Sequence, residues 1–310
     1  MKNFDIIIAG DCNVDLIFND FSKLPDYGEE VLAEKFHFTL GSSAGITAAH
    51  LATLGARVAF IGAIGNDVFG QQFKSMLNKC GVCTDYMPIR NDAKTGCTVV
   101  MSKDEDRANL THAGAMATLS PDDIPMELVQ NTPFFHMSNP YVLPHFRNIL
   151  PEFYQNIKAL DTITSLDPQW DVDEKWDTDL GKLLPQLDTF FPNHNELGLL
   201  LKGNNITLEE LTQECTNSIL MTCGNKGVEL IRDNNKTVFE GYLNENPVDC
   251  IGAGDAFTAG YLRAKIENRC DKEAIDLGCK NGALSTTFEG GNVSYTSRSD
   301  FNEKFESHFL

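Results

Sequence analysis

Short apolar runs alternate with longer segments in which apolar residues recur every three or four positions along most of this chain. The short runs end in Gly, Asn, Asp or Pro and are typical of strands, whereas the longer segments are typical of amphipathic helices. Ile6-Ile7-Ile8 is apolar without interruption, which indicates a strand buried on both faces. This alternation predicts an α/β fold with a mainly parallel central sheet covered by helices on both faces. The strand-like runs are FDIIIAG, RVAFIGAIG, TGCTVVMS, PFFHMS, TITSLDP, DTFFPN, SILMTCG and VELIRD, and the helical segments are AGITAAHLATLG, FGQQFKSMLNKCG, HFRNILPEFYQNIKAL, NELGLLLKG and LEELTQEC.

Two regions break the alternation, because extended segments follow one another there without a helix between them. DLIFND, EVLAEKFHFTL, GCTVVMS and RANLTHA predict four strands of a small separate sheet. The two regions are distant in sequence, so they would pair as two insertions that form a lid beside the main domain. We therefore expect one domain over residues 1–310, with lid segments at approximately 15–40 and 95–113.

Composition narrows the range of partners. A chain of 310 residues with 42% apolar and 9% aromatic content can bury a large core. Its formal net charge of −19 at pH 7 repels polyanions, so we expect no nucleic-acid partner. A small phosphate ligand is compatible with this charge, because backbone amides, a helix N-terminus and a metal ion can hold it locally.

The N-terminal residues MKNFDIIIAGD lack the basic segment and long apolar run of a signal peptide, and no apolar stretch is long enough to cross a bilayer. Nine scattered cysteines suit free thiols in a reducing compartment. We expect a soluble, cytoplasmic protein with no membrane partner. Cys80 and Cys83 form a C-x-x-C, but the βαβ context of a redox motif is not evident and nothing nearby completes a zinc site.

Gly41-Ser42-Ser43-Ala44-Gly45 fits the G-x-S-x-G pattern of a hydrolase nucleophile elbow, and it lies between a predicted strand and a predicted helix. A hydrolase also needs an oxyanion loop before the elbow and an acid and a histidine after it. No HGGG-like segment precedes Gly41, and His194 is the one later histidine that lies within a motif. A serine hydrolase using Ser43 is therefore the least favoured hypothesis.

The late segment PVDCIGAGDAFTAGYLRAKIE contains a glycine turn, Gly252-Ala253-Gly254, followed by Asp255 at the start of a long helix. Successive N–H groups on such a turn form an anion site. An Asp in this place either caps the helix or takes a proton from an attacking hydroxyl, which is the combination that phosphoryl transfer requires. The segment is neither a Walker loop nor a dinucleotide fingerprint, because no GK[ST] follows and Phe257 stands where the last glycine should be.

VDCIGAGDAFTAGYL closely resembles the C-terminal signature of the ribokinase-like (PfkB) carbohydrate kinases. Further matches occur in family order across nearly the whole chain, which makes the combination specific. They are Gly10-Asp11-Cys12-Asn13-Val14-Asp15 after the first strand, Gly28-Glu29 before the lid strand, Gly41-Ser42, Leu54-Gly55 and VAFIGAIGNDVFG for the N-terminal signature, Pro192-Asn193-His194-Asn195-Glu196 for P-N-x-x-E, Thr222, Gly224 and Gly227 for T-x-G-x-x-G, and NGALSTTFEGG for the stretch around the adenine.

The resemblance implies roles for these residues. Asp255 would deprotonate the acceptor hydroxyl, and the N–H groups of Gly252, Ala253 and Gly254 would hold the charge on the transferring phosphoryl group. On the nucleotide side it implies Asn193, Thr222, Gly224, Gly227 and Asn281. Glu196, with Asn193, would organise Mg²⁺ through water, although Asn193 and Glu196 also have the spacing of a helix capping box. Asp249 and the Ile251 carbonyl fall where family members often bind a monovalent cation such as K⁺.

On the acceptor side the resemblance implies that Asn13 and Asp15 bind sugar hydroxyls beside the small-residue turn at Gly41 and Ser42. Arg107, in the second lid segment, is either a contact to an anionic or polyhydroxylated substrate or a solvated residue. Several departures from the family pattern argue against ribose. They are Ile46 in place of an Asn, Ser43 in place of the Lys of ribokinases, and Ser138 and Asn139 in place of a Glu.

The sequence thus favours an ATP-dependent kinase that phosphorylates a hydroxyl, expected to be a CH₂OH group, of a small carbohydrate or sugar acid. A nucleoside kinase of the same fold and a degenerate sugar- or nucleotide-binding protein stay open as alternatives. The lid sheet also raises the expectation of a homodimer, because its apolar residues Leu16, Phe18, Phe36 and Phe38 must be covered either by a second copy or by the protomer's own active site.

Overall fold

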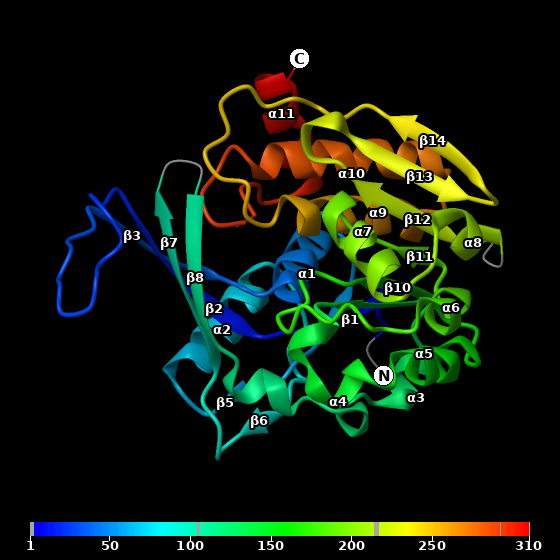
Figure 1. Ribbon diagram of the computed structural model, residues 1–310, viewed down its shortest axis with the longest axis horizontal. Helices are drawn as coiled ribbons and strands as arrows, with labels where there is room; N and C mark the ends of the chain where they lie inside the picture. Colours follow the sequence, from blue (N-terminus) through cyan, green and yellow to red (C-terminus); the bar gives the residue numbers. More distant parts are fainter. Residues whose placement is uncertain (1–2, 104–105, 214–216, 292, 310) are drawn as a thin grey trace.

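The computed structural model describes residues 3–103, 106–213, 217–291 and 293–309, apart from the side chains of residues 103, 106 and 107. An eight-stranded sheet in the order β14-β13-β12-β11-β10-β9-β1-β4 forms its centre (Figure 1). Neighbouring strands from β12 to β4 pair in parallel, and β13 and β14 add antiparallel pairs at one edge. In chain order the strands are β1 (Ile6–Gly10), β4 (Val58–Ile61), β9 (Phe134–Ser138), β10 (Ile163–Asp167), β11 (Thr189–Phe190), β12 (Ser218–Thr222), β13 (Val228–Arg232) and β14 (Asn235–Phe239).

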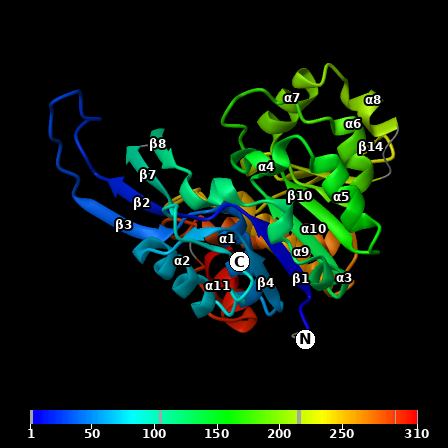
Figure 2. The ribbon, with the colours of Figure 1, turned by 90° about the horizontal axis from the view of Figure 1, so that it is seen from below.

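Strand β1 divides the hydrophobic core, because successive side chains of a strand point to opposite faces of the sheet. Ile6 and Ile8 belong to the cluster formed with α1, α2, α9, α10 and α11, whereas Ile7 belongs to the cluster formed with α3 to α8. All three isoleucines are fully buried, as their uninterrupted apolar run predicts. The α/β fold with helices on both faces is therefore confirmed (Figures 1 and 2).

The helices range from four residues in α4 and α6 to fifteen residues in α10. They are α1 (Ser43–Thr53), α2 (Val68–Lys79), α3 (Met126–Gln130), α4 (Pro144–Arg147), α5 (Leu150–Lys158), α6 (Leu180–Leu183), α7 (His194–Gly203), α8 (Leu208–Gln213), α9 (Ala253–Ile266), α10 (Asp271–Ser285) and α11 (Arg298–Phe309). Short 3₁₀ turns are η1 (Gly114–Thr118), η2 (Pro121–Asp123), η3 (Pro140–Val142), η4 (Leu184–Gln186) and η5 (Gly224–Lys226). In the described part of the chain, none of the helices combines the length and apolar content that a bilayer crossing requires.

A second sheet, in the order β3-β2-β7-β8, lies to one side of the main sheet (Figures 1 and 2). Its central pair β2·β7 is parallel, and each partner carries an antiparallel neighbour. This is the small separate sheet that the two helix-free regions predict. Its strands are β2 (Asn13–Asn19), β3 (Lys35–Leu40), β7 (Gly96–Lys103) and β8 (Asp106–His112), and a two-stranded sheet pairs β5 (Ile64–Gly65) with β6 (Ile89–Arg90).

Two local predictions were incomplete. The segment HFRNILPEFYQNIKAL forms two helices, α4 and α5, rather than one. Pro151 has no N–H to donate to the carbonyl of Arg147, so a continuous helix cannot pass through it, and α5 instead places Pro151 in its first turn. Strand β14 was not predicted, because its residues are largely polar and exposed.

Candidate active site

The carboxyl ends of the parallel strands bring a set of polar residues to one edge of the main sheet, which is where α/β proteins place their ligands. Asp11 and Asn139 follow β1 and β9, Asp167 ends β10, Asn193 follows β11, and Thr222 ends β12. The N-termini of α1 and α9 face the same edge, since Ser43 of α1 contacts Asp255 of α9. These residues therefore converge although the most distant of them, Asp11 and Asp255, are 244 positions apart in sequence.

Helix α9 begins at the predicted glycine turn. Gly252 has a positive φ of 73°, which favours glycine, and a Cβ there would lie only 2.9 Å from Gly291 Cα. A Cβ on Gly254 would meet no atom within 4 Å, so the backbone next to the first turn of α9 is open to a ligand. The turn thus places the N-terminus of α9 beside open space, as an anion site requires, although the Ala253 N–H already donates to the Cys250 carbonyl oxygen at 3.3 Å.

Asp255 lies in the first turn of α9 and is 7% exposed. Its Oδ1 accepts hydrogen bonds from Ser43 Oγ at 2.5 Å and from Gln169 Nε2 at 3.1 Å. Burial raises the pKa of Asp255 to about 7, the hydrogen bond from Ser43 opposes the rise, and the charges of Asp11, Glu196 and Asp15 add to it. A carboxyl group with a pKa near neutrality is suited to accept a proton at physiological pH.

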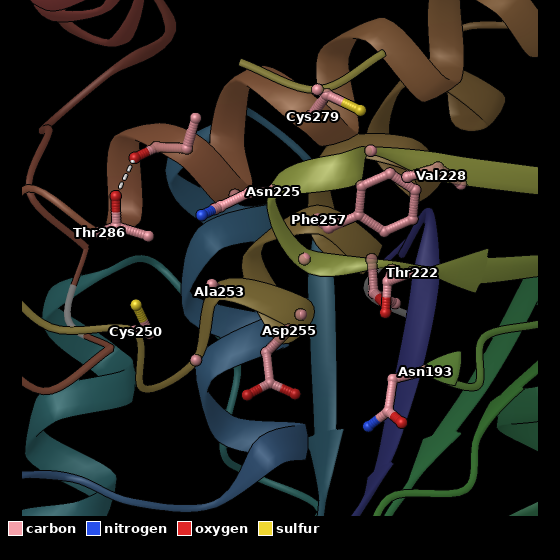
Figure 3. A pocket seen from close by; sticks show the side chains of 18 of the residues that line it. Asn193, Thr222, Asn225, Val228, Cys250, Ala253, Asp255, Phe257, Cys279 and Thr286 are labelled. Carbon is pink, nitrogen blue, oxygen red and sulfur yellow. Dashed lines mark hydrogen bonds between the residues drawn. The ribbon is translucent and has the colours of Figure 1, made fainter. Parts of the chain in front are cut away.

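Two cavities meet at Asp255. The larger has a volume of about 490 Å³ and extends over the start of α9 towards β12 and α10, as Figure 3 shows from close by. The smaller has a volume of about 320 Å³ and extends from Asp255 towards the small sheet. Gln169, Cys250, Gly252 and Asp255 line both cavities. A group bound in one cavity can therefore approach a group bound in the other beside the Asp255 carboxylate.

The larger cavity collects most of the residues predicted on the nucleotide side. Asn193, Thr222, Gly224 and Gly227 line it (Figure 3), together with the glycine turn of α9 and the apolar side chains of Val228 and Phe257. Gly227 has a φ of 90°, and a Cβ there would lie 2.1 Å from the Phe239 carbonyl oxygen, so the turn between β12 and β13 needs glycine.

Asn281 does not line this cavity. Its amide is fully buried, donating to the Ala256 carbonyl oxygen at 2.6 Å and accepting from the Tyr295 hydroxyl at 2.8 Å. These bonds hold α10 against α9, so the geometry speaks against the nucleotide contact predicted for Asn281. Its neighbours Cys279, Gly282, Ala283 and Thr286 face the cavity instead.

Asn193 and Glu196 form the capping box that their spacing allows. Asn193 Oδ1 accepts from the Glu196 N–H at 2.9 Å, and Glu196 Oε2 accepts from the Asn193 N–H at 2.8 Å. Both residues nevertheless line the larger cavity, so capping and ligand binding are compatible. Burial raises the pKa of the Glu196 carboxyl group.

Asp167 is a site residue that the sequence analysis missed. It lines the larger cavity, and its pKa is raised well above its usual range by burial first, and then by the negative charges of Glu196 and Asp255. Among the described residues no group of three or more His, Cys, Asp or Glu side chains could enclose a metal ion. Two buried acids that repel each other beside an open cavity do, however, fit a hydrated Mg²⁺, which dehydrates reluctantly and binds through its water molecules.

The smaller cavity holds the residues predicted on the acceptor side. Asn13, Asp15 and Ser42 line it, and Asn13 Nδ2 donates to Asp15 Oδ1 at 2.9 Å and to Thr98 Oγ1 at 3.1 Å. A Cβ on Gly41 would lie 2.3 Å from Asp15 Oδ1, so this turn requires glycine. Strand β7, which supplies Thr98, thereby helps to fix the orientation of the predicted sugar-binding pair.

Asp11 also lines this cavity. Its carboxylate accepts from the N–H groups of Ser43 and Ala44, and from the side chains of Ser42 and Asn139. These contacts fix the start of α1, so Asp11 satisfies the N–H groups that the helix end leaves unpaired. Burial still raises the pKa of Asp11.

The departures from the family pattern also surround the smaller cavity. Ile46 and Asn139 line it, whereas Ser138 is fully buried and hydrogen-bonded to His136. Trp170 and Val172 form an apolar side of the same cavity and are 47% and 61% exposed. The side chain of Arg107 lies outside the described residues, so its predicted substrate contact stays a prediction.

Asp249 and Ile251 lie in the loop before α9. Asp249 Oδ1 accepts from the Ile251 N–H and Oδ2 accepts from the Gly290 N–H, both at 2.9 Å. These bonds fix the loop next to Gly252. Monovalent cation binding here stays a prediction.

The geometry does not support a hydrolase. Ser43 donates to a carboxylate, and within the described residues no histidine is hydrogen-bonded to it. His50 and His136 are buried at other positions, and burial lowers their pKa values to about 4 and about 3. The two cysteines of the C-x-x-C, Cys80 and Cys83, are likewise not joined by a disulfide.

The sheet, the glycine turn and two cavities that meet at a carboxylate define a small-molecule kinase of the ribokinase-like fold. The chain belongs to the pfkB family of carbohydrate kinases, whose family model matches residues 3–298.

Known relatives support this assignment. Ribokinase of Arabidopsis thaliana is 26% identical over 309 residues, which are 94% of this chain and 79% of that protein. Adenosine kinase from Sinorhizobium meliloti has the same fold, with a TM-score of 0.83, 20% identity, and coverage of 97% of this chain and 99% of that chain. A structure from E. coli in complex with ATP and Mg²⁺ has a TM-score of 0.81, 20% identity, and coverage of 98% and 100%. Kinases of sugars and of nucleosides thus both occur among the relatives.

Proposed function

We propose that this protein transfers the γ-phosphoryl group of ATP to a CH₂OH group of a small carbohydrate. The observation that carries the proposal is the position of Asp255, which lines both cavities and follows a glycine turn at a helix N-terminus. ATP occupies the larger cavity, and the acceptor occupies the smaller one beside Asn13 and Asp15.

In this mechanism Asn13 and Asp15 orient the acceptor through its hydroxyl groups. Asp255 takes the proton of the attacking hydroxyl while the new oxygen–phosphorus bond forms and the bond to the leaving ADP breaks. The N–H groups of Gly252, Ala253 and Gly254 hold the charge on the transferring group. The proton then leaves Asp255 for solvent as the phosphorylated product departs.

Glu196 and Asp167, together with Asn193, are the residues that would hold hydrated Mg²⁺. When bound, the ion supplies positive charge to the phosphate oxygens. The five acids Asp11, Asp15, Asp167, Glu196 and Asp255 would otherwise repel the triphosphate. Asp249 and the Ile251 carbonyl are our candidates for a K⁺ site.

The test is an assay of ADP release with Mg-ATP over ketoses, aldoses, sugar acids and nucleosides. We expect at least one polyol to be phosphorylated. The variant Asp255→Asn should bind ATP with unchanged affinity and lose about 10²- to 10⁴-fold in kcat, because it cannot accept the proton. Full turnover by this variant would refute the mechanism, and no turnover by the wild-type protein with any acceptor would favour a binding protein instead.

A nucleoside kinase is the second candidate, and Trp170 favours it. An exposed indole and Val172 at the mouth of the acceptor cavity offer an apolar surface that a free sugar does not need, whereas a nucleobase could stack on it. Trp170→Ala should raise the KM for a nucleoside about tenfold or more and leave the KM for a monosaccharide within about twofold. Equal effects on both acceptors would argue against this candidate.

A further inference from the structure

The serine of the G-x-S-x-G segment has no role in the mechanism so far, yet it contacts the proposed base directly. Ser43 Oγ donates to Asp255 Oδ1 at 2.5 Å, and Gln169 Nε2 donates to the same oxygen at 3.1 Å. The two donors come from α1 and from the loop after β10, so three distant segments meet at one carboxylate oxygen. Oδ1 accepts both of these side-chain hydrogen bonds. Oδ2 accepts no side-chain hydrogen bond from any described residue.

The position of Ser43 is fixed by the turn that precedes α1. Its own N–H donates to Asp11 Oδ2 at 3.1 Å, and Ser42 Oγ donates to the Asp11 carbonyl oxygen at 2.6 Å. Ser42 has a φ of 68°, a left-handed conformation that is rare for residues other than glycine. The surrounding bonds therefore hold this turn in an unfavourable conformation that directs Ser43 towards α9.

Gln169 is held in a comparable way. It has a φ of 55°, and its N–H donates to Asp167 Oδ1 at 3.1 Å. Asp171, two residues further along the loop, fixes the loop itself. Its carboxylate accepts from Nη1 and Nη2 of Arg147, at 2.7 and 2.6 Å, and from three backbone N–H groups. Bidentate pairing of this kind fixes geometry, so the loop presents the Gln169 amide to Asp255 in a defined position.

We propose that Ser43 and Gln169 are positioning residues that hold Oδ1 of Asp255 and leave Oδ2 to accept the proton of the acceptor hydroxyl. A carboxylate free to rotate would offer its accepting oxygen in many directions, and small misplacements of reacting groups are costly. This inference rests on the proposed kinase function. The Ser43 hydroxyl is then a support for the base and not a nucleophile.

The two donors also counteract the electrostatic environment of Asp255. Four acids act on its charge, namely Asp11 after β1, Asp15 on β2, Asp167 on β10 and Glu196 on α7. These charges favour the protonated, inactive form of the base, whereas hydrogen bonds from Ser43 and Gln169 favour the carboxylate. Losing either donor should therefore both misplace Oδ2 and raise the pKa of Asp255.

The experiment compares Ser43→Ala, Gln169→Ala and the conservative Ser43→Thr in the ADP-release assay as a function of pH. Both alanine variants should lose about 10- to 100-fold in kcat at pH 8, keep the KM for ATP within about twofold, and shift the acidic limb of kcat/KM to higher pH. Ser43→Thr keeps the hydroxyl and should recover most of the rate. Ser307→Ala, which removes an exposed hydroxyl far along α11, is the matched control and should behave as wild type.

A double-mutant cycle separates positioning from a general loss of structure. In the Asp255→Asn background the base is absent, so adding Ser43→Ala should cost less than about threefold. An equal loss in both backgrounds, or an acidic limb that does not move, would overturn the proposal.

A wild-type protein without turnover would refute the proposed function and not the positioning role. Carbon-13 NMR titration of the Asp255 carboxyl group would then test whether Ser43 acts on the base. A higher pKa in Ser43→Ala than in wild type supports it, and an unchanged pKa refutes it.

Discussion

At the scale of single residues, the buried carboxyl group of Asp255 lies among four other acids. Asp11 and Asp15 approach it from the acceptor side, and Glu196 and Asp167 approach it from the nucleotide side. A cluster of this kind destabilises the free protein, because several negative charges are held in a region of low dielectric.

One prediction follows for stability against pH. The folded-state pKa of Asp255 is about 7, above its ordinary value of 3.8. The folded protein therefore holds this proton more tightly than the unfolded chain, and the associated stability is lost as pH rises from about 4 through about 7. Asp255→Asn cannot ionise, so at pH 8 it should be more stable than wild type, on the order of a few kcal/mol or several degrees in Tm.

Thermal unfolding of both proteins at pH 5, 6, 7 and 8 is the measurement. The difference in Tm should grow with pH and level off above about pH 7. A variant that is less stable than wild type at every pH would contradict the raised pKa.

The residues found from the sequence and those missed differ in one respect. Asp255, Asn13 and Asp15 lie in motifs whose glycines and spacing are visible in the chain, whereas Asp167 and Gln169 follow an ordinary apolar strand that ends in Asp-Pro. Their importance depends on burial and on the pairing of β10 with β9, which places Asp167 beside Ser138. A rule that examines every acid at the carboxyl end of a buried parallel strand would have found Asp167.

At the scale of elements, the small sheet has two chemically different faces. Asp15, Thr98 and Thr111 occupy registered positions on one face and line the smaller cavity. Leu16, Phe18, Phe36, Phe38, Val99 and Leu110 occupy registered positions on the other face. The apolar face therefore points away from the smaller cavity of the same protomer, which favours a second copy of the chain as its cover over the protomer's own active site.

We predict a dimer through this face. Phe36 and Leu110 are 55% and 70% exposed, and burying each in an interface would contribute about 1 to 2 kcal/mol. Phe36→Ser with Leu110→Ser should weaken self-association by at least about tenfold in sedimentation equilibrium. Val238→Ser on β14, which changes an equally exposed apolar residue elsewhere, should have no effect. A wild-type protein that stays monomeric at high concentration would contradict the prediction.

Most elements were predictable because the period of the apolar residues differs between buried strands and amphipathic helices. The antiparallel β13–β14 edge and the division of α4 from α5 were not, since an exposed edge strand has little apolar signal and a single proline decides the division. Ile17 lies within the apolar run from Leu16 to Phe18, but the alternation along β2 places it on the opposite face from these two neighbours, the face that carries Asp15. The Ile17 side chain is 2% exposed.

At the scale of the whole molecule, the net charge of −19 opposes the approach of a negatively charged nucleotide. Salt screens such long-range repulsion, with a Debye length of about 10 Å at 0.1 M. We therefore predict that kcat/KM for Mg-ATP rises severalfold between about 10 and 150 mM ionic strength, whereas kcat/KM for an uncharged acceptor stays within about twofold. Initial rates in a series of chloride concentrations test this, and a fall for Mg-ATP would mean that local positive charge controls the encounter.

The two cavities are neighbours that share Asp255, Gln169, Cys250 and Gly252 in their linings. A single compound that joins adenosine to an acceptor mimic through a chain of phosphates could therefore occupy both at once. Linking the two halves makes the second binding event intramolecular, so such a bisubstrate inhibitor should bind 10²- to 10⁴-fold more tightly than either half. The linker length that binds best would then measure the path that the phosphoryl group travels.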